Sequence, residues 1–396
     1  MYYLLGKKLS HSYSVDIHNE LGNDDYSVFE TDSLESFFSD INFKGLNITI
    51  PYKEEVIEYL DDLSETAKKT NSVNTILKIE DRLIGYNTDY DGFVALINYH
   101  NIDLINKRIL ILGSGATSRT VKYYLEDYTK HIDVCSRNGS LNYSNLENHY
   151  EIVINTTPNG MHRDTDDDLL NLTDFTNLEV VIDLIYNPLR TRLIQSAKCK
   201  VVNGLYMLVY QAALANSLFF NKKTSQKEID RIYNELLSSK LNIVFIGMPM
   251  SGKTTIGKEV ANTMKREFID IDDLITYRTG KSIQELFDDK IFREVESKII
   301  NSIEGSGKII STGGGVVENI DNITHLRKNG ILVYIEQPLE TLLSRPMDSR
   351  PLLKDKDSLI DIYKRRLPLY NSYADITVKP DFDMEVIYEF ISSKWC

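Results

Sequence analysis

The sequence predicts an α/β protein whose mostly parallel sheets are covered by helices. Three observations support this fold class: short apolar runs of strand length, amphipathic stretches between them, and two glycine-rich turns that directly follow such a run. The predicted strands are Leu46–Ile50, Arg108–Leu112, Ile152–Asn155, Val180–Leu184, Asn242–Ile246, Lys308–Ser311 and Leu332–Ile335. A strand that ends in a glycine turn and continues into a helix is the order of elements found in nucleotide-binding domains.

The composition indicates a globular chain of two or three domains. The chain has 396 residues, of which 42% are hydrophobic and 26% are charged, and its formal net charge is −13. The acidic balance argues against a nucleic-acid or membrane-surface partner, and no apolar run approaches the roughly 20 residues of a membrane span. The N-terminal residues lack the layout of a signal peptide, and Cys135, Cys199 and Cys396 are far apart. We therefore expect free thiols in a cytoplasmic protein.

The segment Gly247–Thr254 reads GMPMSGKT and matches the phosphate-loop pattern G-x-x-x-x-G-K-[ST]. It follows the predicted strand Asn242–Ile246 and precedes a helical stretch, which is the setting that this loop requires. The glycines let backbone N–H groups surround a polyphosphate at a helix N-terminus, the lysine adds a positive charge, and the threonine adds a hydroxyl for Mg²⁺. The predicted residues of this ATP and Mg²⁺ site are Gly247, Gly252, Lys253, Thr254 and Thr255.

A second glycine turn reads Gly113-Ser-Gly115-Ala116 and lies between the strand Arg108–Leu112 and a predicted helix, Thr117–Tyr128. This G-x-G-A pattern is shorter than the full dinucleotide-binding pattern, so a purely structural left-handed turn is the alternative. Its position after a strand and before a helix favours a dinucleotide-binding turn.

The end of the following strand indicates which dinucleotide is bound. The predicted strand His131–Cys135 is followed by a serine and an arginine, whereas an NAD-selective site usually has a carboxylate there. A guanidinium suits a 2′-phosphate, so the sequence predicts NADP or NADPH, with a surface arginine that binds no ligand as the alternative. The predicted cofactor-binding residues are Gly113, Gly115, Ala116, Ser136 and Arg137.

Seven ordered blocks occupy residues 1 to about 220. They are Leu9–Ser14 with His18 and Asn19, Gly45–Glu54, Ser72–Thr75, Asn87–Asp89, Asn155–Met161, Asp183–Pro188 and Asn203–Ala212. Together these blocks resemble the shikimate dehydrogenase family; Gly45–Glu54, for example, reads GLNITIPYKE against the family's G-x-N-V-T-x-P-F-K-E. The resemblance implies a substrate-binding α/β domain and an NADP-binding Rossmann-like domain that reduce 3-dehydroshikimate to shikimate.

The resemblance assigns the reduction to a lysine–aspartate pair. Reduction of a ketone by hydride also requires a proton, and Lys53 is the implied acid/base, held by Asp89, which also binds a substrate hydroxyl. The implied substrate-binding residues, whose polar side chains suit a polyhydroxylated ring carboxylate, are Ser12, Ser14, Asn47, Thr49, Asn74, Tyr186 and Gln211, and Gly204 is implied at the cofactor. A surface position for Lys53 and a helix-capping role for Asp89 are the structural alternatives.

Further blocks follow the phosphate loop. They are Phe268–Ile275, Thr279–Phe287, Phe292–Glu296, Ser311–Gly315, Arg350–Leu353, and Arg366–Tyr370 with Ala374 and Asp375. With the loop itself, these blocks resemble the shikimate kinase family over residues 241 to 396. The resemblance implies a P-loop, parallel-sheet domain of the nucleoside-monophosphate-kinase type that phosphorylates the 3-hydroxyl of shikimate.

Residue roles in the kinase half also come from this resemblance. Asp270 is implied to hold Mg²⁺ through water, and Asp272 to bind the acceptor hydroxyl with a possible base role. The substrate carboxylate is assigned to Arg293 and Arg366, because guanidinium groups bind carboxylates in a bidentate manner; a helix-surface ion pair is the alternative for Arg293. Glu296 is expected to orient Arg293. The remaining implied site residues are Gly314, for close backbone approach, and Arg350 and Lys253, at the transferring phosphoryl group.

Several residues depart from the family patterns. Val15, Tyr90 and Ala116 replace residues that are usually proline or glycine. Tyr206 replaces a glycine near the nicotinamide, so its side chain must point away or reshape the pocket. Met250 replaces a glycine of the phosphate loop, a change that we expect to affect loop rigidity more than activity.

The two resemblances together predict a bifunctional shikimate-pathway enzyme. The predicted parts are a substrate-binding domain (1–95, completed by 203–222), a Rossmann-like domain (96–202), a connecting helix (223–240) and a kinase domain (241–396). The alternatives are an NAD-dependent quinate/shikimate dehydrogenase fused to a kinase for a related polyol acid, against which Arg137 argues, and an inactive sensor, against which the complete set of catalytic side chains argues. The predicted partners are small molecules (3-dehydroshikimate, shikimate, NADPH and ATP), with no nucleic acid or membrane, and no oligomeric state is predicted.

Overall fold

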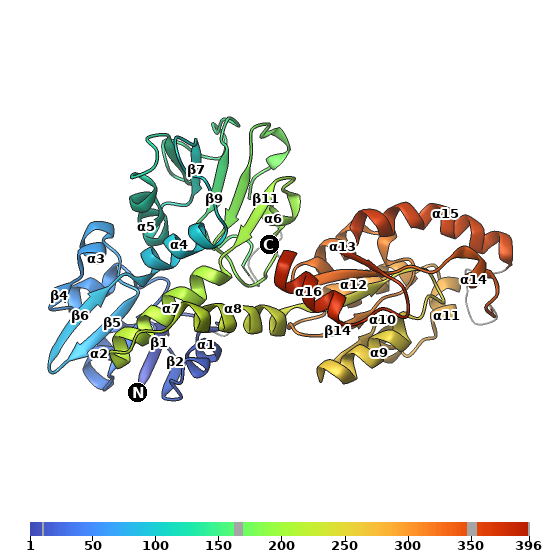
Figure 1. The fold of residues 1–396 in the computed structure, drawn as a ribbon, viewed down its shortest axis with the longest axis horizontal. Helices are drawn as coiled ribbons and strands as arrows, with labels where there is room; N and C mark the ends of the chain where they lie inside the picture. The colour runs from blue at the N-terminus through green and yellow to red at the C-terminus, as the bar shows by residue number, and fades with distance from the viewer. Residues whose placement is uncertain (10–11, 162–168, 347–354, 395–396) are drawn as a thin grey trace. The chain divides into compact units, whose positions relative to one another are not determined.

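The computed structural model describes residues 1–9, 12–161, 169–346 and 355–394. The chain divides into two compact units, Met1–Leu236 and a second unit that begins at Leu237 (Figure 1). Each unit combines helices with sheets, so the predicted α/β class is confirmed. No helix in the described residues has the length and apolar character needed to cross a membrane.

The first sheet of the N-terminal unit has six strands in the order β2-β1-β3-β5-β6-β4. The strands are β1 (Tyr2–Gly6), β2 (Tyr26–Glu30), β3 (Gly45–Ile48), β4 (Asp62–Leu63), β5 (Thr75–Ile79) and β6 (Arg82–Tyr86). The helices of this part are α1 (Ser14–Glu20), α2 (Leu34–Asp40), the 3₁₀ helix η1 (Glu55–Tyr59), α3 (Glu65–Thr70) and α4 (Thr88–Tyr99). The sheet is mixed, because β5 is antiparallel to both β3 and β6. Residues 80 and 81 join β5 to β6 as a tight hairpin, with Glu80 at a φ of 54°.

The second sheet of this unit is fully parallel and has the order β11-β10-β9-β7-β8. Its strands are β7 (Ile109–Leu112), β8 (Ile132–Cys135), β9 (Ile152–Asn155), β10 (Val180–Asp183) and β11 (Lys200–Asn203). Every residue of β7, β9 and β10 is buried, which explains why these strands read as continuous apolar runs rather than alternating ones. The short helices are α5 (Ala116–Leu125), η2 (Leu172–Asp174) and α6 (Arg192–Ser196).

Two long helices connect the sheets of the N-terminal unit. Helix α4 leads from the first sheet towards β7, and α7 (Leu205–Phe220) returns directly from β11, and the two helices pack against each other. Helix α8 (Gln226–Lys240) follows, and its apolar stripe of Ile229, Ile232, Leu236 and Leu237 is buried. The 3.6-residue spacing of this stripe therefore identified an amphipathic helix.

The second unit contains a five-stranded parallel sheet of order β13-β14-β12-β15-β16. Its strands are β12 (Asn242–Ile246), β13 (Phe268–Asp270), β14 (Ile309–Ser311), β15 (Gly330–Ile335) and β16 (Ile376–Val378). The helices are α9 (Lys253–Met264), α10 (Ile271–Thr279), α11 (Ile283–Asp288), α12 (Phe292–Asn301), η3 (Val316–Glu318), α13 (Ile320–Arg327), α14 (Leu339–Leu343), α15 (Lys356–Tyr373) and α16 (Glu385–Lys394). The first strand, β12, lies at the centre of the sheet, so the loops after β12, β13 and β14 meet at one edge.

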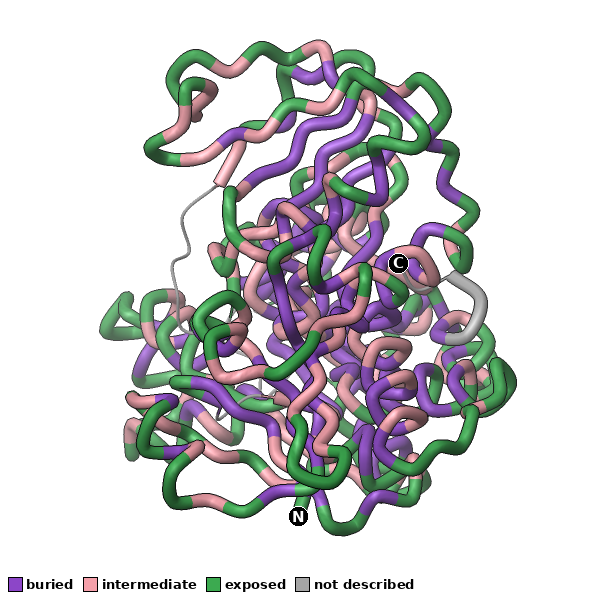
Figure 2. The backbone as a smooth tube through the Cα atoms, turned by 90° about the vertical axis from the view of Figure 1, so that its left-hand side faces the viewer, coloured by how far each residue is buried: buried purple, intermediate pink, exposed green. Residues whose placement is uncertain are grey.

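Buried residues follow the strands, whereas exposed residues gather on the connecting loops and outer helix faces (Figure 2). The core of the second unit contains Val244, Ile246, Ile310, Leu332 and Tyr334 from the central strands, all buried. This core fixes the strand ends, and the polar loops that follow them are the places where functional side chains can be exposed.

Candidate active sites

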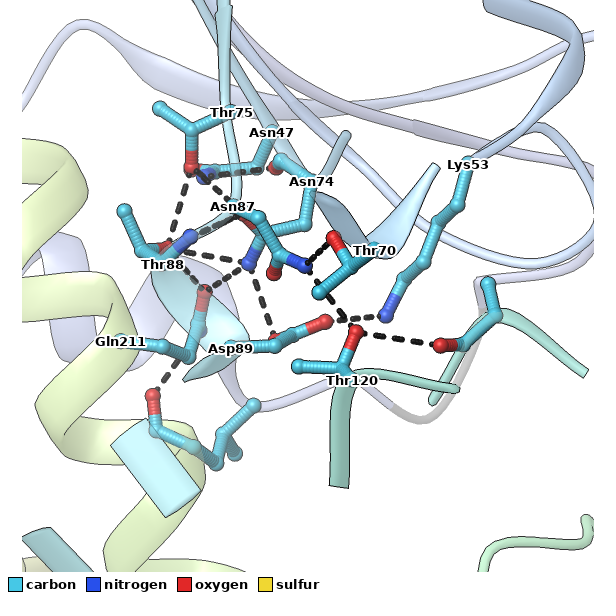
Figure 3. A network of polar contacts seen from close by, with 12 residues as sticks. Asn47, Lys53, Thr70, Asn74, Thr75, Asn87, Thr88, Asp89, Thr120 and Gln211 are labelled. Atoms are coloured by element: carbon cyan, nitrogen blue, oxygen red, sulfur yellow. Dashed lines mark hydrogen bonds and ion pairs between the residues drawn. The ribbon is translucent and has the colours of Figure 1, made fainter. Parts of the chain in front are cut away.

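The first site is built around an ion pair between Lys53 and Asp89 (Figure 3). Lys53 lies in the turn after β3, and Asp89 is in the first turn of α4. Lys53 Nζ is 2.5 Å from Asp89 Oδ2, and the two side chains are only 14% and 10% exposed. Asp89 is thus engaged with the lysine rather than capping its helix. A lysine held in this way by a carboxylate can hold and move a proton at a substrate oxygen.

Asn74 is the centre of a polar network behind this ion pair. Its side-chain nitrogen is 2.9 Å from the second carboxylate oxygen of Asp89 and 3.2 Å from Oε1 of Gln211 in α7. Asn47 joins the same network, because its amide nitrogen donates to the Asn74 carbonyl oxygen and its amide oxygen accepts a hydrogen bond from Tyr26. Figure 3 shows these side chains converging from β3, from the residue before β5, and from α4 and α7. Both oxygens of Asp89 are therefore occupied by donors that fix the carboxylate beside Lys53.

The remaining sequence-predicted substrate residues lie on neighbouring loops. Ser12 donates a hydrogen bond to Ser14 at 3.1 Å, and the ring of Tyr186 lies 5.4 Å from that of Tyr13. Burial raises the pKa of the Tyr186 phenol, and a hydrogen bond with Ser12 opposes this rise. Thr49 follows β3 directly and lies on the same connection as Lys53. The structure thus brings Ser12, Ser14 and Tyr186 together. Thr49 immediately follows β3, the strand that contains Asn47.

The glycine turn after β7 leaves space at the N-terminus of α5. Gly113 has a φ of 105°, which favours glycine, and a Cβ atom there would crowd Thr156 and Thr157. Gly115 is the N-cap residue of α5, and a Cβ atom on it would meet nothing within 4 Å. The first backbone N–H groups of a helix lack partners within the helix, so this open N-terminus fits the pyrophosphate of a dinucleotide.

Arg137 follows β8 and is exposed, next to Ser136. Among the described residues, its guanidinium has no carboxylate partner. Burial raises the pKa of the nearby Tyr143 phenol, and the positive charge of Arg137 opposes this rise. A free cation at this strand end fits the 2′-phosphate of NADP. Of the residues expected at this cofactor, Gly115 and Arg137 are exposed, Gly113, Ala116 and Ser136 are partly buried, and Gly204 is buried.

The structure shows how the chain accommodates Tyr206 in place of a glycine. The Tyr206 side chain points towards α8: its hydroxyl donates to Asp230 at 2.8 Å and accepts from Gln226 at 2.7 Å. Its ring stacks on Tyr99 at 4.0 Å. The neighbouring Gly204 is required for a different reason, because a Cβ atom there would overlap the Leu184 backbone. The side chain thus turns away from the glycine that was expected to contact the cofactor.

Arg119 is a contributor to this site that the sequence-based assignment missed. It lies on α5, yet its guanidinium is 2.8 Å from Glu54 and donates to the Thr70 carbonyl oxygen. Glu54 is adjacent to Lys53, so Arg119 connects α5 to the loop that carries Lys53. The signal was an arginine within the glycine-turn motif, which the dinucleotide pattern does not use.

The second site is built on the phosphate loop. Gly252 has a φ of 98° and is the N-cap residue of α9, whose first residue is Lys253. The Lys253 ammonium is buried and donates to the backbone carbonyl oxygens of Gly247 and Met248 at 3.0 and 2.9 Å. The lysine therefore closes the loop on itself, and phosphate oxygens are the stronger acceptors that would replace these carbonyl groups.

Thr254 and Asp270 form the expected magnesium position. The Thr254 hydroxyl donates to Asp270 Oδ2 at 2.7 Å, and Asp270 Oδ1 accepts from the backbone N–H of Asp272. Mg²⁺ is usually held by one or two protein oxygens together with water and substrate phosphates. The Thr254 hydroxyl and the Asp270 carboxylate are oxygens of this kind.

Each glycine of Gly313–Gly315 makes room for a different neighbour. A Cβ atom on Gly313 would lie 3.0 Å from Glu296 and 3.1 Å from Asp272, one on Gly314 would overlap Pro249 of the phosphate loop, and one on Gly315 would overlap the Arg293 guanidinium. None of the three has a positive φ. The glycines are therefore required by close packing of the site, not by backbone conformation.

The two arginines predicted to bind a carboxylate are close together. Arg293 Nη1 is 2.6 Å from Glu296, which is fully buried, and burial raises the pKa of Glu296 while the Arg293 charge opposes this rise. Arg366 is only 1% exposed, and its Nη2 is 2.9 Å from Glu318. Glu318 also contacts Arg293 at 3.2 Å, so one acidic residue bridges the pair. Sequence reasoning had assigned no role to Glu318.

These groups surround one cavity of about 490 Å³. The cavity is lined by nearly all of the predicted kinase residues: Gly252, Lys253, Thr254, Thr255, Asp270, Asp272, Arg293, Gly314 and Arg366. Arg345 also lines it and donates to the Met250 carbonyl oxygen. The predicted lid residue Arg350 lies outside the described residues. The arrangement can hold a polyphosphate at the loop and an acidic polyol beside it.

Comparisons with known families agree with both family resemblances. The model of the shikimate dehydrogenase substrate binding domain matches residues 4–76, and the shikimate kinase model matches residues 249–393. The chain is 36% identical over 260 residues to the shikimate dehydrogenase (NADP(+)) of Clostridium beijerinckii, covering 59% of this chain and 96% of that protein. The homologous enzyme of one Clostridium perfringens strain is 35% identical over 263 residues, covering 59% of this chain and 97% of that protein.

Solved structures give the same result for the N-terminal unit. Shikimate dehydrogenase 1 from Peptoclostridium difficile is 33% identical with a TM-score of 0.55, covering 59% of this chain and 97% of that chain. Shikimate 5-dehydrogenase from Thermus thermophilus, solved with NADP(H) and shikimate, is 27% identical with a TM-score of 0.52, covering 59% of this chain and 98% of that chain. The chain therefore belongs to the shikimate dehydrogenase family, and a shikimate kinase domain follows the dehydrogenase region in the same polypeptide.

Proposed function

We propose that this chain reduces 3-dehydroshikimate to shikimate with NADPH and then phosphorylates the 3-hydroxyl of shikimate with ATP and Mg²⁺. The observation that carries the proposal is the assembly, within each unit, of residues that are far apart in sequence but belong to one reaction. Lys53 meets Asp89 in the first unit, and Thr254 meets Asp270 in the second. The hydroxyl formed at the first site is the nucleophile required at the second, so the two reactions are chemically consecutive.

In the reduction, NADPH supplies a hydride to the ketone carbon when it is bound. Lys53 gives a proton to the ketone oxygen, and Asp89 holds the ammonium within 2.5 Å in a position that is largely shielded from water. Asn74 donates to the carboxylate of Asp89 and to Gln211, and both amide side chains are available to the substrate hydroxyls. Arg119 supports the Lys53 loop through Glu54.

In the phosphorylation, ATP supplies the phosphoryl group and Mg²⁺ neutralises phosphate charge when they are bound. Lys253 exchanges its loop carbonyl partners for phosphate oxygens, and Thr254 and Asp270 hold the metal position. Asp272, at the start of α10, orients the acceptor hydroxyl and accepts its proton. Arg293 and Arg366 bind the carboxylate of shikimate and fix the ring so that the 3-hydroxyl faces the phosphate loop.

A two-step assay of the purified chain tests the proposal. NADPH oxidation is followed after addition of 3-dehydroshikimate, and ADP release is followed after addition of ATP and Mg²⁺. We expect both signals, with Lys53→Ala abolishing only the first and Lys253→Ala abolishing only the second when shikimate is supplied directly. A chain that binds the ligands but turns over neither substrate would be a sensor, and preference for NADH with quinate would support the related polyol-acid enzyme.

A further inference from the structure

The carboxylate of Glu318 lies between the two arginines that are expected to bind the substrate carboxylate. Glu318 is the last residue of η3, directly after the glycine-rich segment. Its Oε2 is 3.2 Å from Arg293 Nη2 and 2.9 Å from Arg366 Nη2, and its Oε1 is 2.8 Å from Arg365 Nη2. A protein carboxylate therefore occupies the position that the chemistry assigns to the carboxylate of the ligand.

Glu318 leaves one nitrogen of the Arg366 guanidinium without a hydrogen bond. The Arg366 side chain is 1% exposed, and its Nε has no hydrogen-bond partner among the described residues. A buried donor without a partner is costly, and a guanidinium can present Nε and Nη2 together to the two oxygens of one carboxylate. Glu318 takes only Nη2. A ligand carboxylate that takes both nitrogens would place a second negative charge beside Glu318, and the repulsion between the two carboxylates favours displacement of Glu318 from Nη2.

Glu318 is ionised in this setting. Burial alone would raise its pKa, but hydrogen bonding to Arg366 and the charges of Arg366, Arg365 and Arg293 hold the pKa below its usual value. The side chain is 26% exposed, so solvent is available to receive it when it leaves the pair. Arg365, whose side chain is 60% exposed, offers a second partner at the solvent side.

We propose that Glu318 is an internal ligand of the Arg293–Arg366 pair that competes with the carboxylate of the substrate and thereby sets the KM for shikimate. In the absence of substrate it places a negative charge beside both guanidinium groups, and this charge opposes the binding of other small anions. Shikimate displaces it, because the substrate adds hydroxyl contacts that a simple anion lacks. This inference rests on the proposed kinase function.

The test is the steady-state kinetics of Glu318→Gln, which keeps the shape of the side chain and removes its charge. We expect the KM for shikimate to fall by roughly two- to fivefold, the range for losing one partly exposed charge pair, with kcat and the KM for ATP unchanged. Acetate should inhibit the variant competitively against shikimate and have little effect on the wild type. Glu259→Gln, an exposed residue of α9, is the matched control for the same change in net charge.

An opposite result would identify Glu318 as a support for the arginines. A KM for shikimate that rises or stays the same in a folded Glu318→Gln protein overturns the proposal. Glu318→Asp, which keeps the charge but withdraws the carboxylate by one methylene group, decides the question if the glutamine variant does not fold: a lower KM supports competition, and a higher or unchanged KM refutes it. ADP release by the wild type with shikimate is measured first, because failure there refutes the proposed function itself.

Discussion

The two sites differ in what their charged groups contact before substrate arrives. In the dehydrogenase region, Lys53 is paired with Asp89, whose other oxygen is held by Asn74. These contacts can persist with substrate bound, because the proton donor and its orienting group are both protein residues. In the kinase domain, Lys253 binds the carbonyl groups of its own loop, and Arg293 and Arg366 bind Glu318. Those contacts must be exchanged for ligand oxygens.

The difference follows from the charge of the ligand groups that these side chains meet. The groups expected at Lys53 and Asp89 are a ketone and hydroxyls, which carry no charge, although the substrate and NADPH carry charges elsewhere. This part of the first site can therefore be assembled in advance and still bind its substrate by hydrogen bonds. ATP and a carboxylate carry several negative charges, and cations that were left unpaired to receive them would be costly to bury. The kinase domain therefore keeps its cations paired with its own oxygens, and ligand binding is an exchange of partners.

The largest effect is expected at the ion pair between Lys53 and Asp89, which is formed before substrate binds. Lys53→Ala should lower kcat for 3-dehydroshikimate reduction by about 10²- to 10⁴-fold, the usual contribution of a positioned acid/base group. Kinase turnover of supplied shikimate should be unchanged. The measurement is NADPH oxidation at saturating substrate, with the exposed Lys69→Ala on α3 as the matched control. Reduction at the wild-type rate by Lys53→Ala would show that the proton comes from another group.

The next largest effect is expected at Arg293 and Arg366, whose contacts with Glu318 would be exchanged for contacts with the substrate carboxylate. Arg293→Lys keeps the charge but cannot contact Glu296 and Glu318 together, as the guanidinium does. We expect the KM for shikimate to rise by about 10- to 100-fold, because a bidentate, charge-assisted interaction is lost, while the KM for ATP changes little. Arg278→Lys, an exposed arginine on α10, is the control. A raised KM for ATP with normal shikimate binding would place Arg293 at the nucleotide instead.

A smaller effect is expected at the dinucleotide turn, where the cation is exposed. Arg137→Ala should lower kcat/KM for NADPH by about tenfold and leave kcat/KM for NADH nearly unchanged, because only NADPH carries a 2′-phosphate. The ratio of the two values in one preparation is the measurement, and NADH is its internal control. Equal use of NADH and NADPH by the wild type would contradict the assignment of Arg137.

Much of this arrangement could be predicted because it depends on local signals. Gly113 and Gly252 have the positive φ that their motifs require, and α8 has the buried stripe that its periodicity indicates. The hairpin between β5 and β6 was missed because its turn is Glu80-Asp81, which lacks the glycine or asparagine of a typical two-residue turn.

Other features depend on contacts that no sequence pattern records. The direction of the Tyr206 side chain is set by Asp230 and Gln226, which lie on a helix that follows α7. Glu318 is one acidic residue among many, and only the turn of η3 brings it to the arginine pair. The same applies to Arg119 on α5, whose partner Glu54 lies in the turn between β3 and η1.

Tyr206 and Met250 both replace a glycine, and the comparison between the two units extends to them. Tyr206 lies within a helix and is accommodated by packing against Tyr99 and α8. Met250 lies in the phosphate loop with a φ of 66°, in the left-handed region that disfavours side chains. Its side chain packs at the edge of the core, and its carbonyl oxygen accepts a hydrogen bond from Arg345. Packing thus offsets a backbone cost in the kinase domain that has no counterpart at Tyr206.

The smallest expected effect is at Met250, where two substitutions separate the contribution of side-chain packing from that of the left-handed backbone. Met250→Gly and Met250→Ala remove the same packing, but only glycine relieves the left-handed backbone. Met250→Gly should therefore have a free energy of unfolding about 1 kcal/mol higher than that of Met250→Ala, the reverse of the order at an ordinary helical site. The measurement is denaturant unfolding of the kinase transition, which ATP should shift upwards in both variants. If the alanine variant is equally or more stable, Met250 does not strain the loop, and the cost inferred from its φ is absent.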